Sequence, residues 1–230
     1  MSHLLCSIDV DYDWTYASTQ PDLRALYEKA KGAQWDAAKA LPWSTSVDLA
    51  KSPYPEYLTP LYGSDIYAKM TAREKEELQV DLGAWLASQF LHGENGALFA
   101  ASQLVMCVPD RDSKAYAATQ VIDEARHVEV YERYVRETVG IRYDVNPHLK
   151  RLLDLTLTDS RWDVKLLGMQ IMVEGLALAA FGSIRQSTTE RALEGAHDRG
   201  HARRSEACRV RALRAARCVR RDDRSRALRA

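Results

Sequence analysis

Three glutamates and one histidine lie in helical segments that are otherwise rich in apolar residues. Glu94 lies in SQFLHGENGALFAASQL, and Glu174 lies in GMQIMVEGLALAAF. Glu124 and His127 lie in QVIDEARHVEVY, and their i, i+3 spacing places both side chains on one face of a helix. A buried, isolated carboxylate costs roughly several kcal/mol, so each glutamate needs a cation or a pairing partner. A pair of metal ions would satisfy all of them.

Each of these residues also has a simpler interpretation. An exposed Glu-x-x-His pair on a helix surface is common without a metal, and Glu174 could pair with a buried arginine or histidine instead. Asp123 is either a group that orients a ligand histidine or a solvated acid. His92 is expected to pack or to form a hydrogen bond and not to be a ligand.

The elements that would position these residues are all predicted to be helices, because apolar residues recur with a helical period and no strand pattern with a period of two extends over a useful length. Thr71 opens one long helix or two consecutive ones, stopped by Pro109. Asp110 to Ser113 supply N-cap residues for the next helix, which Gly140 closes. The predicted helices span residues 21–41, 71–108, 112–140, 146–157 and 161–186, with a loop at 42–63. The last helix, almost uniformly apolar from 166 to 181, is expected to be buried on all sides.

Composition separates the chain into two parts. The 230 residues are 46% hydrophobic and 28% charged, which is typical of a globular protein. Residues 186–230 contain 13 Arg, no Lys and six acids, which leaves 19 basic and 26 acidic residues, a net charge of −7, for residues 1–185. The tail has no Phe, Tyr or Trp and no docking motif, so we expect a solvated or poorly folded segment that does not bind nucleic acid. The start of the chain has no signal-peptide pattern, and we expect a cytoplasmic protein without a membrane span.

The order of Glu94, Glu124 with His127, and Glu174 carries a family resemblance. HGENGALFAASQL, DEARHVEVYERYV and VEGLALAAF resemble the ligand helices of ferritin-like, R2-like diiron-carboxylate proteins, which include diiron oxygenases and ribonucleotide reductase small subunits. YEKAKGAQWDAAKALPWS is similar to the tryptophan-containing entry segment of bacterial members, so the likeness covers about residues 20–185. It implies a four-helix bundle, with an additional N-terminal helix, that holds two iron ions or iron and manganese. Glu94 and His127 would bind one ion, Glu174 the other, and Glu124 would bridge them.

The family pattern also requires a second Glu-x-x-His on a fourth helix, and this chain does not contain it. Glu124 follows Glu94 by 30 residues, so the spacing from Glu174 points to about position 204, where the chain reads RRSEACRV. Codons that encode HARRSEACRVR at residues 201–211 can spell MPDEARHVAFG in the next reading frame. We therefore hypothesise that residues 1–185 form the ferritin-like domain. Residues 186–230 would be a frame-displaced remnant of the fourth ligand helix.

The resemblance implies an oxidoreductase that uses dioxygen to oxidise an organic substrate, with electrons from a donor protein and with homodimers usual among relatives. Loss of the second Glu-x-x-His predicts partial or single-metal occupancy and impaired activity. Two other interpretations stay open. One is a non-catalytic metal-binding or incompletely folded ferritin-like protein, and the other is an iron-storage or helical interaction protein.

Overall fold

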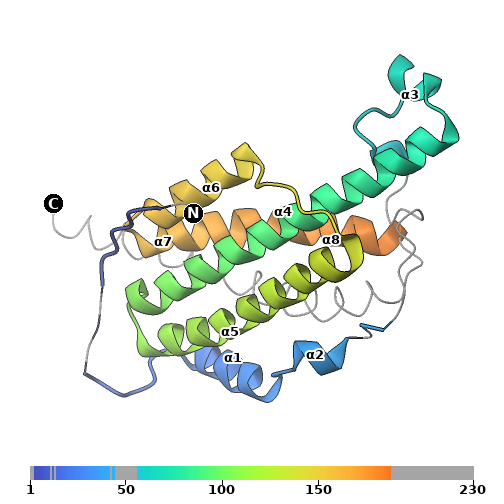
Figure 1. Ribbon diagram of the computed structural model, residues 1–230. Coiled ribbons are helices and arrows are strands. Elements are labelled where there is room, and N and C mark those ends of the chain that lie inside the picture. Colours follow the sequence, from blue (N-terminus) through green and yellow to red (C-terminus); the bar gives the residue numbers. More distant parts are fainter. Residues whose placement is uncertain (1–2, 11, 13, 42, 45–55, 188–230) are drawn as a thin grey trace.

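The computed structural model describes residues 3–10, 12, 14–41, 43–44 and 56–187, and all secondary structure in these residues is helical (Figure 1). This confirms the prediction of an all-α protein of the helical-bundle type. The predicted frame-displaced helix and nearly all of the Arg-rich tail lie outside the described residues. Within the described part of the chain, none of the helices is both long enough and apolar enough to cross a lipid bilayer.

Two long helices, α4 (Ala72–Cys107) and α5 (Arg111–Tyr134), pack side by side along their lengths (Figure 1). The segment from Thr71 is a single helix. It starts with a capping box, in which the Glu74 backbone N–H donates to Thr71 Oγ1 and the Thr71 backbone N–H donates to the Glu74 carboxylate. Asp110 caps α5 by accepting a hydrogen bond from the Ser113 backbone N–H at 2.9 Å. Only a short connection therefore separates the two helices, and they run antiparallel.

The N-terminal part of the chain packs against α5 from the other side. Helix α1 (Pro21–Gly32) contacts α5, and the buried carboxylate of Asp112 accepts hydrogen bonds from Ser18 Oγ and the backbone N–H groups of Thr19 and Gln20.

The prediction of one continuous helix over residues 21–41 is wrong. The helix stops after Gly32, and a separate helix, α2 (Ala37–Ala40), starts where the Asp36 carboxylate accepts from the Ala38 backbone N–H. An aspartate at this position favours a new helix start over continuation.

Two short elements precede α4. A 3₁₀ turn, η1 (Glu56–Leu58), lies within the predicted loop, and α3 (Asp65–Lys69) follows it with Ser64 as its N-cap. Beyond α5 the chain forms a π-helical turn, η2 (Val135–Val139), which ends at Gly140 with a φ of 75°. This positive φ favours glycine, as the predicted helix end there required.

The last described elements are α6 (Pro147–Thr158) and a continuous helical run made of α7 (Trp162–Lys165), the π-helical segment η3 (Leu166–Val173) and α8 (Glu174–Ser187). Helical structure over 161–186 agrees with the prediction, but complete burial does not. Leu167, Met172 and Leu176 are exposed by 49%, 51% and 66%.

Two glycines allow α6 to approach its neighbours closely. A Cβ atom on Gly96 of α4 would lie 2.5 Å from a methyl group of Leu153, and one on Gly168 of η3 would lie 2.7 Å from Thr156 Oγ1. At these contacts a buried cluster forms from Ala97, Ala100, Leu153, Leu157 and Met169. Helix α6 is thus fixed against both α4 and the helical run that carries Glu174.

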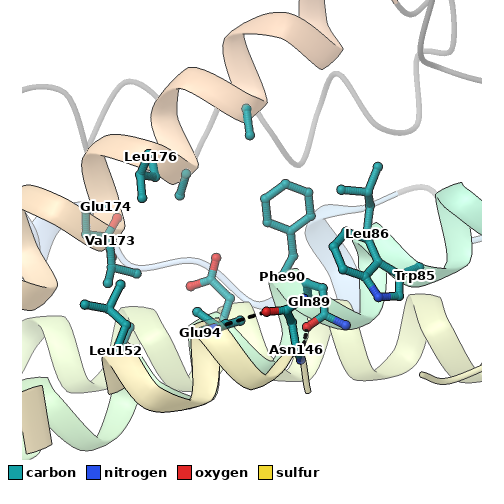
Figure 2. Close-up of a pocket in the computed structure, with 15 residues that line it drawn as sticks. Trp85, Leu86, Gln89, Phe90, Glu94, Asn146, Leu152, Val173, Glu174 and Leu176 are labelled. Carbon is teal, nitrogen blue, oxygen red and sulfur yellow. Dashed lines mark hydrogen bonds between the residues drawn. The ribbon is translucent and has the colours of Figure 1, made fainter. Parts of the chain in front are cut away.

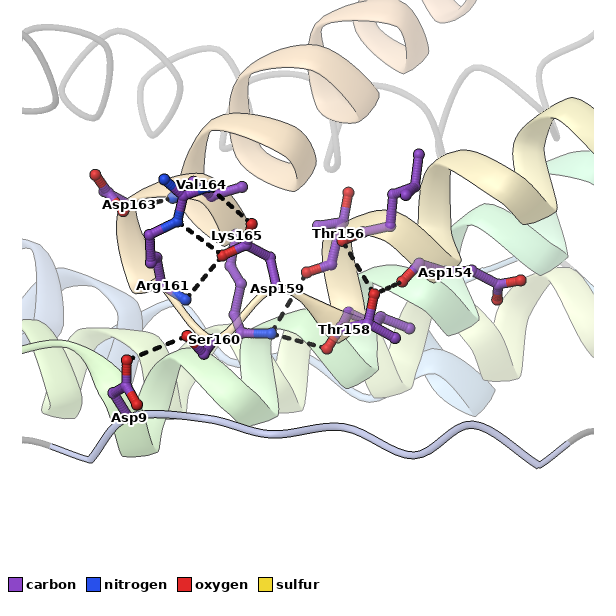
Figure 3. A network of polar contacts seen from close by, with 12 residues as sticks. Asp9, Asp154, Thr156, Thr158, Asp159, Ser160, Arg161, Asp163, Val164 and Lys165 are labelled. Atoms are coloured by element: carbon purple, nitrogen blue, oxygen red, sulfur yellow. Dashed lines mark hydrogen bonds and ion pairs between the residues drawn. The ribbon is translucent and has the colours of Figure 1, made fainter.

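A fully buried lysine joins the same elements (Figure 3). Lys165 Nζ donates to Gln103 Oε1 on α4 at 2.7 Å and to the Leu157 carbonyl oxygen, in the last turn of α6, at 2.8 Å. Burial lowers the pKa of Lys165, while these oxygen acceptors and the C-terminal end of α6 suit a positive charge. The lysine therefore holds α4, α6 and α7 together.

Candidate metal centre

Three of the four predicted ligands converge between α4 and α5. His127 Nδ1 lies 3.0 Å from Glu124 Oε2 and 3.3 Å from Glu94 Oε2. One donor atom from each of the three residues lies within 4.8 Å of the others. Both carboxylates are buried, each with 4% of its surface exposed. The pairing across the two helices follows from their tight antiparallel packing, which sets the middle of α4 beside the middle of α5.

The donor set fits a divalent transition metal. Carboxylate oxygens and an imidazole nitrogen together suit iron and manganese. Metal–ligand distances of about 2.0 to 2.2 Å place two ligands at right angles around one ion about 3 Å apart. The separations of 3.0 and 3.3 Å between His127 Nδ1 and the two carboxylates are of that size. Only small side-chain movements are therefore needed for the three groups to surround one ion.

Glu174 has a different place in the site. It is the first residue of α8, directly after the π-helical segment η3, and it is 5% exposed. Its carboxylate is not one of the three donors that lie within 4.8 Å of one another. It lines the same cavity as Glu94 (Figure 2). The structure thus brings Glu174 to the cavity that Glu94 also lines but not into the three-residue cluster.

Asp123 forms an ion pair with Arg126, which lies one turn further along α5. The Arg126 guanidinium also donates to Gln34 Oε1 at 2.6 Å and to the Trp35 carbonyl oxygen at 3.2 Å. Asp123 and Arg126 therefore connect the ligand helix to the segment between α1 and α2. Sequence reasoning did not single out Arg126. Its position between Glu124 and His127 in DEARH was the available signal, but its partners are about 90 residues away in the chain.

Two further side chains near the site have clear partners. His92 Nε2 lies 2.9 Å from the Tyr143 carbonyl oxygen, which agrees with the expected hydrogen-bonding role. Phe90 stacks on Tyr131 with ring centroids 5.8 Å apart. Phe90 is one helical turn before Glu94, and Tyr131 is one turn after His127, so the aromatic pair lies beside the three donors.

A cavity of about 430 Å³ borders the site between α4, α6 and the η3–α8 run (Figure 2). Its surface is almost entirely apolar, and its size is in the range of small-molecule sites. Figure 2 shows Glu94, Val173 and Glu174 toward one end and Trp85 and Leu86 toward the other. Because Glu94 follows Trp85 by nine positions in α4, the cavity extends along that helix for roughly 13 Å at 1.5 Å per residue.

Comparison with known proteins gives one family. The model of the family described as P-aminobenzoate N-oxygenase AurF matches residues 18–174, which is more than half of the chain and includes all four predicted ligands. No curated protein and no solved structure matches the chain.

Proposed function

Because the chain belongs to the P-aminobenzoate N-oxygenase AurF family, a family of ferritin-like diiron enzymes, we propose that its fold serves to oxidise a small organic molecule with dioxygen. The observation that carries the proposal is the convergence of Glu94, Glu124 and His127 beside an apolar cavity. An apolar cavity next to a metal centre can hold an organic substrate beside the ion, as oxygen chemistry on such a substrate needs.

We assign a separate role to each group of residues in the site. Glu94, Glu124 and His127 would hold one iron ion, and Glu174 together with Glu124 would hold the second. Bound ferrous ions would supply the electrons that reduce dioxygen, and a donor protein would restore those electrons between turnovers. The apolar wall of the cavity would bind the substrate and keep water away, and Phe90 and Tyr131 would shield the donors from the side of their helices.

We further propose that this chain is impaired at the second ion. Counting along the sequence, that ion keeps only Glu174 and the bridging Glu124, because the second Glu-x-x-His of the family pattern is missing near position 204. Two carboxylates are too few for a stable site, since a metal in such proteins takes four or more ligands. The frame-displaced remnant hypothesis explains the loss. The alternative is a metal-binding protein of the same fold without catalysis.

A frame-restored gene tests the function and the impairment together. The chain as given and a chain in which residues 201–211 read MPDEARHVAFG are loaded with ferrous iron without oxygen, and bound iron is measured after gel filtration. We expect at most one iron per given chain and two per restored chain, with oxidation of p-aminobenzoate or a related amine only in the restored chain. Two irons per given chain would contradict the proposed impairment. A restored chain without iron or oxidation would contradict the proposed function.

A further inference from the structure

The charged groups that line the cavity described above are all acidic within the described part of the chain. Glu94 and Glu174 are the only ionisable side chains among its described lining residues, and both are buried. The other described lining residues are apolar or, at Gln89 and Asn146, carry neutral amides. A ligand with a carboxylate would therefore enter an apolar space that already contains two carboxylates, with no described lysine, arginine or histidine on its wall.

The two amide side chains on the cavity wall already form hydrogen bonds within the protein. Gln89 Nε2 donates to the Asp144 carbonyl oxygen at 3.0 Å, and Gln89 Oε1 accepts from the Asn146 backbone N–H at 2.7 Å. Asn146 Oδ1 accepts from the His148 backbone N–H at 2.9 Å, as the N-cap of α6. These contacts fix the connection before α6. Neither amide carries a positive charge, so these side chains offer an anionic ligand neutral hydrogen-bond donors and no counterion.

The shape and the polarity of the cavity indicate its occupant. A cavity of roughly 150 Å³ is enough to hold a benzene ring, so about 430 Å³ accommodates one substituted ring with space to spare. Phe90 and Trp85 offer aromatic surface, and the two glutamates at one end accept hydrogen bonds from N–H donors. An uncharged aromatic ring with one amino group therefore suits both ends of the cavity. The ring can contact the aromatic residues, and the amino group can donate to the two glutamates.

We propose that this cavity binds an aromatic amine without an acidic substituent, with its amino group directed toward Glu94 and Glu174 and its uncharged end toward Trp85 and Leu86. The inference rests on the proposed function in treating the cavity as the substrate site. In addition, amines that carry a carboxylate would not be the preferred ligands of this chain. The physical reason is that a carboxylate loses its hydration in an apolar cavity and gains no counterion from the described residues that line it.

Calorimetric titration of the full-length protein tests this preference without requiring turnover. p-Aminobenzamide and p-aminobenzoate have nearly the same shape and differ in charge. We expect the amide to bind at least about tenfold more tightly than the carboxylate, because of the desolvation cost of the charge. We also expect benzamide, which lacks the amino group, to bind more weakly than p-aminobenzamide. Equal or tighter binding of p-aminobenzoate, or no binding of p-aminobenzamide, would overturn the proposal.

A charge added to the wall tests the location. Leu86→Lys places a cation at the Trp85 end, and we expect it to raise the affinity for p-aminobenzoate by about fivefold or more. Leu155→Lys adds the same charge at an exposed position of α6 that is not part of the cavity wall, and we expect no change in preference. An equal effect of both substitutions would overturn the assignment to this cavity.

The two proposals fail in different ways. If p-aminobenzamide binds with the expected preference but the iron-loaded, frame-restored protein oxidises no amine, the proposed function is wrong and the ligand assignment holds. If the loaded protein oxidises p-aminobenzoate faster than p-aminobenzamide at equal subsaturating concentrations, the oxygenase function holds and the ligand assignment is wrong.

Discussion

At the scale of single residues, the important feature is the position of His127 Nδ1 between two buried carboxylates. It lies 3.0 Å from Glu124 Oε2 and 3.3 Å from Glu94 Oε2. Carboxylates this close and this buried repel each other unless a positive or hydrogen-bonding group separates them. An imidazole fills this role in the structure, and the same geometry fits the proposed metal ion.

His127→Ala tests the metal role of the site. We expect it to weaken ferrous-ion binding by at least about tenfold, because one of three converging donors is lost. Anaerobic calorimetric titration measures the change. Glu129→Gln, at an exposed position on the same helix, serves as the control and should bind iron like the unsubstituted protein. Equal ferrous-ion affinities of the His127→Ala and Glu129→Gln proteins would show that His127 is not a metal ligand.

At the scale of elements, the close approach of α6 to its neighbours positions Glu174 relative to Glu94. The π-helical segment η3 lies directly before Glu174, and such segments are rare and often found at functional sites. Gly168 within η3 touches Thr156 of α6 so closely that a methyl group has no space. The packing of η3 on α6 thus helps to set where Glu174 meets the cavity.

Gly168→Ala is expected to lower the free energy of unfolding by about 1 to 3 kcal/mol, because the added methyl group would overlap the stiff, buried Thr156 side chain. Gly83→Ala in α4 is the matched control. No atom lies within 4 Å of its added methyl group, so alanine should be neutral or stabilising by up to about 1 kcal/mol. Urea denaturation measures both. A Gly168→Ala protein as stable as the Gly83→Ala protein would show that the contact is not tight.

The elements that the sequence predicted well are those whose signals are local. The starts of α4 and α5 were readable from Thr71 and Asp110, because a capping side chain acts within its own first turn. The convergence of Glu94 with Glu124 and His127 was predicted from the family order. The Arg126 contact with Gln34 was not predicted, because the two residues are 92 positions apart in the sequence. The π-helical form of η3 was not predicted either, because its residues have no periodicity that separates it from an α-helix. The full burial expected for the last helix was wrong, because apolar composition alone does not identify what covers each face.

At the scale of the whole molecule, the connection between α6 and α7 contacts the N-terminal segment of the chain through polar and charged groups (Figure 3). Asp159 accepts hydrogen bonds from the Arg161 side chain and backbone N–H, and Ser160 Oγ donates to Asp9 near the N-terminus. The Arg161 side chain, followed by its backbone N–H, lowers the pKa of Asp159 from 3.8 to about 2. This connection therefore gives the fold an acid-sensitive element.

The sign of the pH effect follows from this lowered pKa. Between pH 3.8 and about 2, the unfolded chain binds a proton at Asp159 that the folded chain does not bind, so stability falls as the pH falls. The contribution should be below about 1 kcal/mol because Arg161 is largely exposed to solvent. Urea denaturation at pH 5, 3 and 2 should show a shallower loss of stability for Asp159→Asn than for the unsubstituted protein. Identical pH profiles would contradict this assignment.

The most direct test of the metal centre is a crystal structure of the full-length protein grown anaerobically with ferrous iron, with anomalous difference maps recorded on both sides of the iron edge. We predict an iron peak bounded by the carboxylates of Glu94 and Glu124 and by His127 Nδ1, with weak or no density for a second ion next to Glu174. Iron bound elsewhere, or a protein saturated with iron and without a peak among these three side chains, would contradict the account.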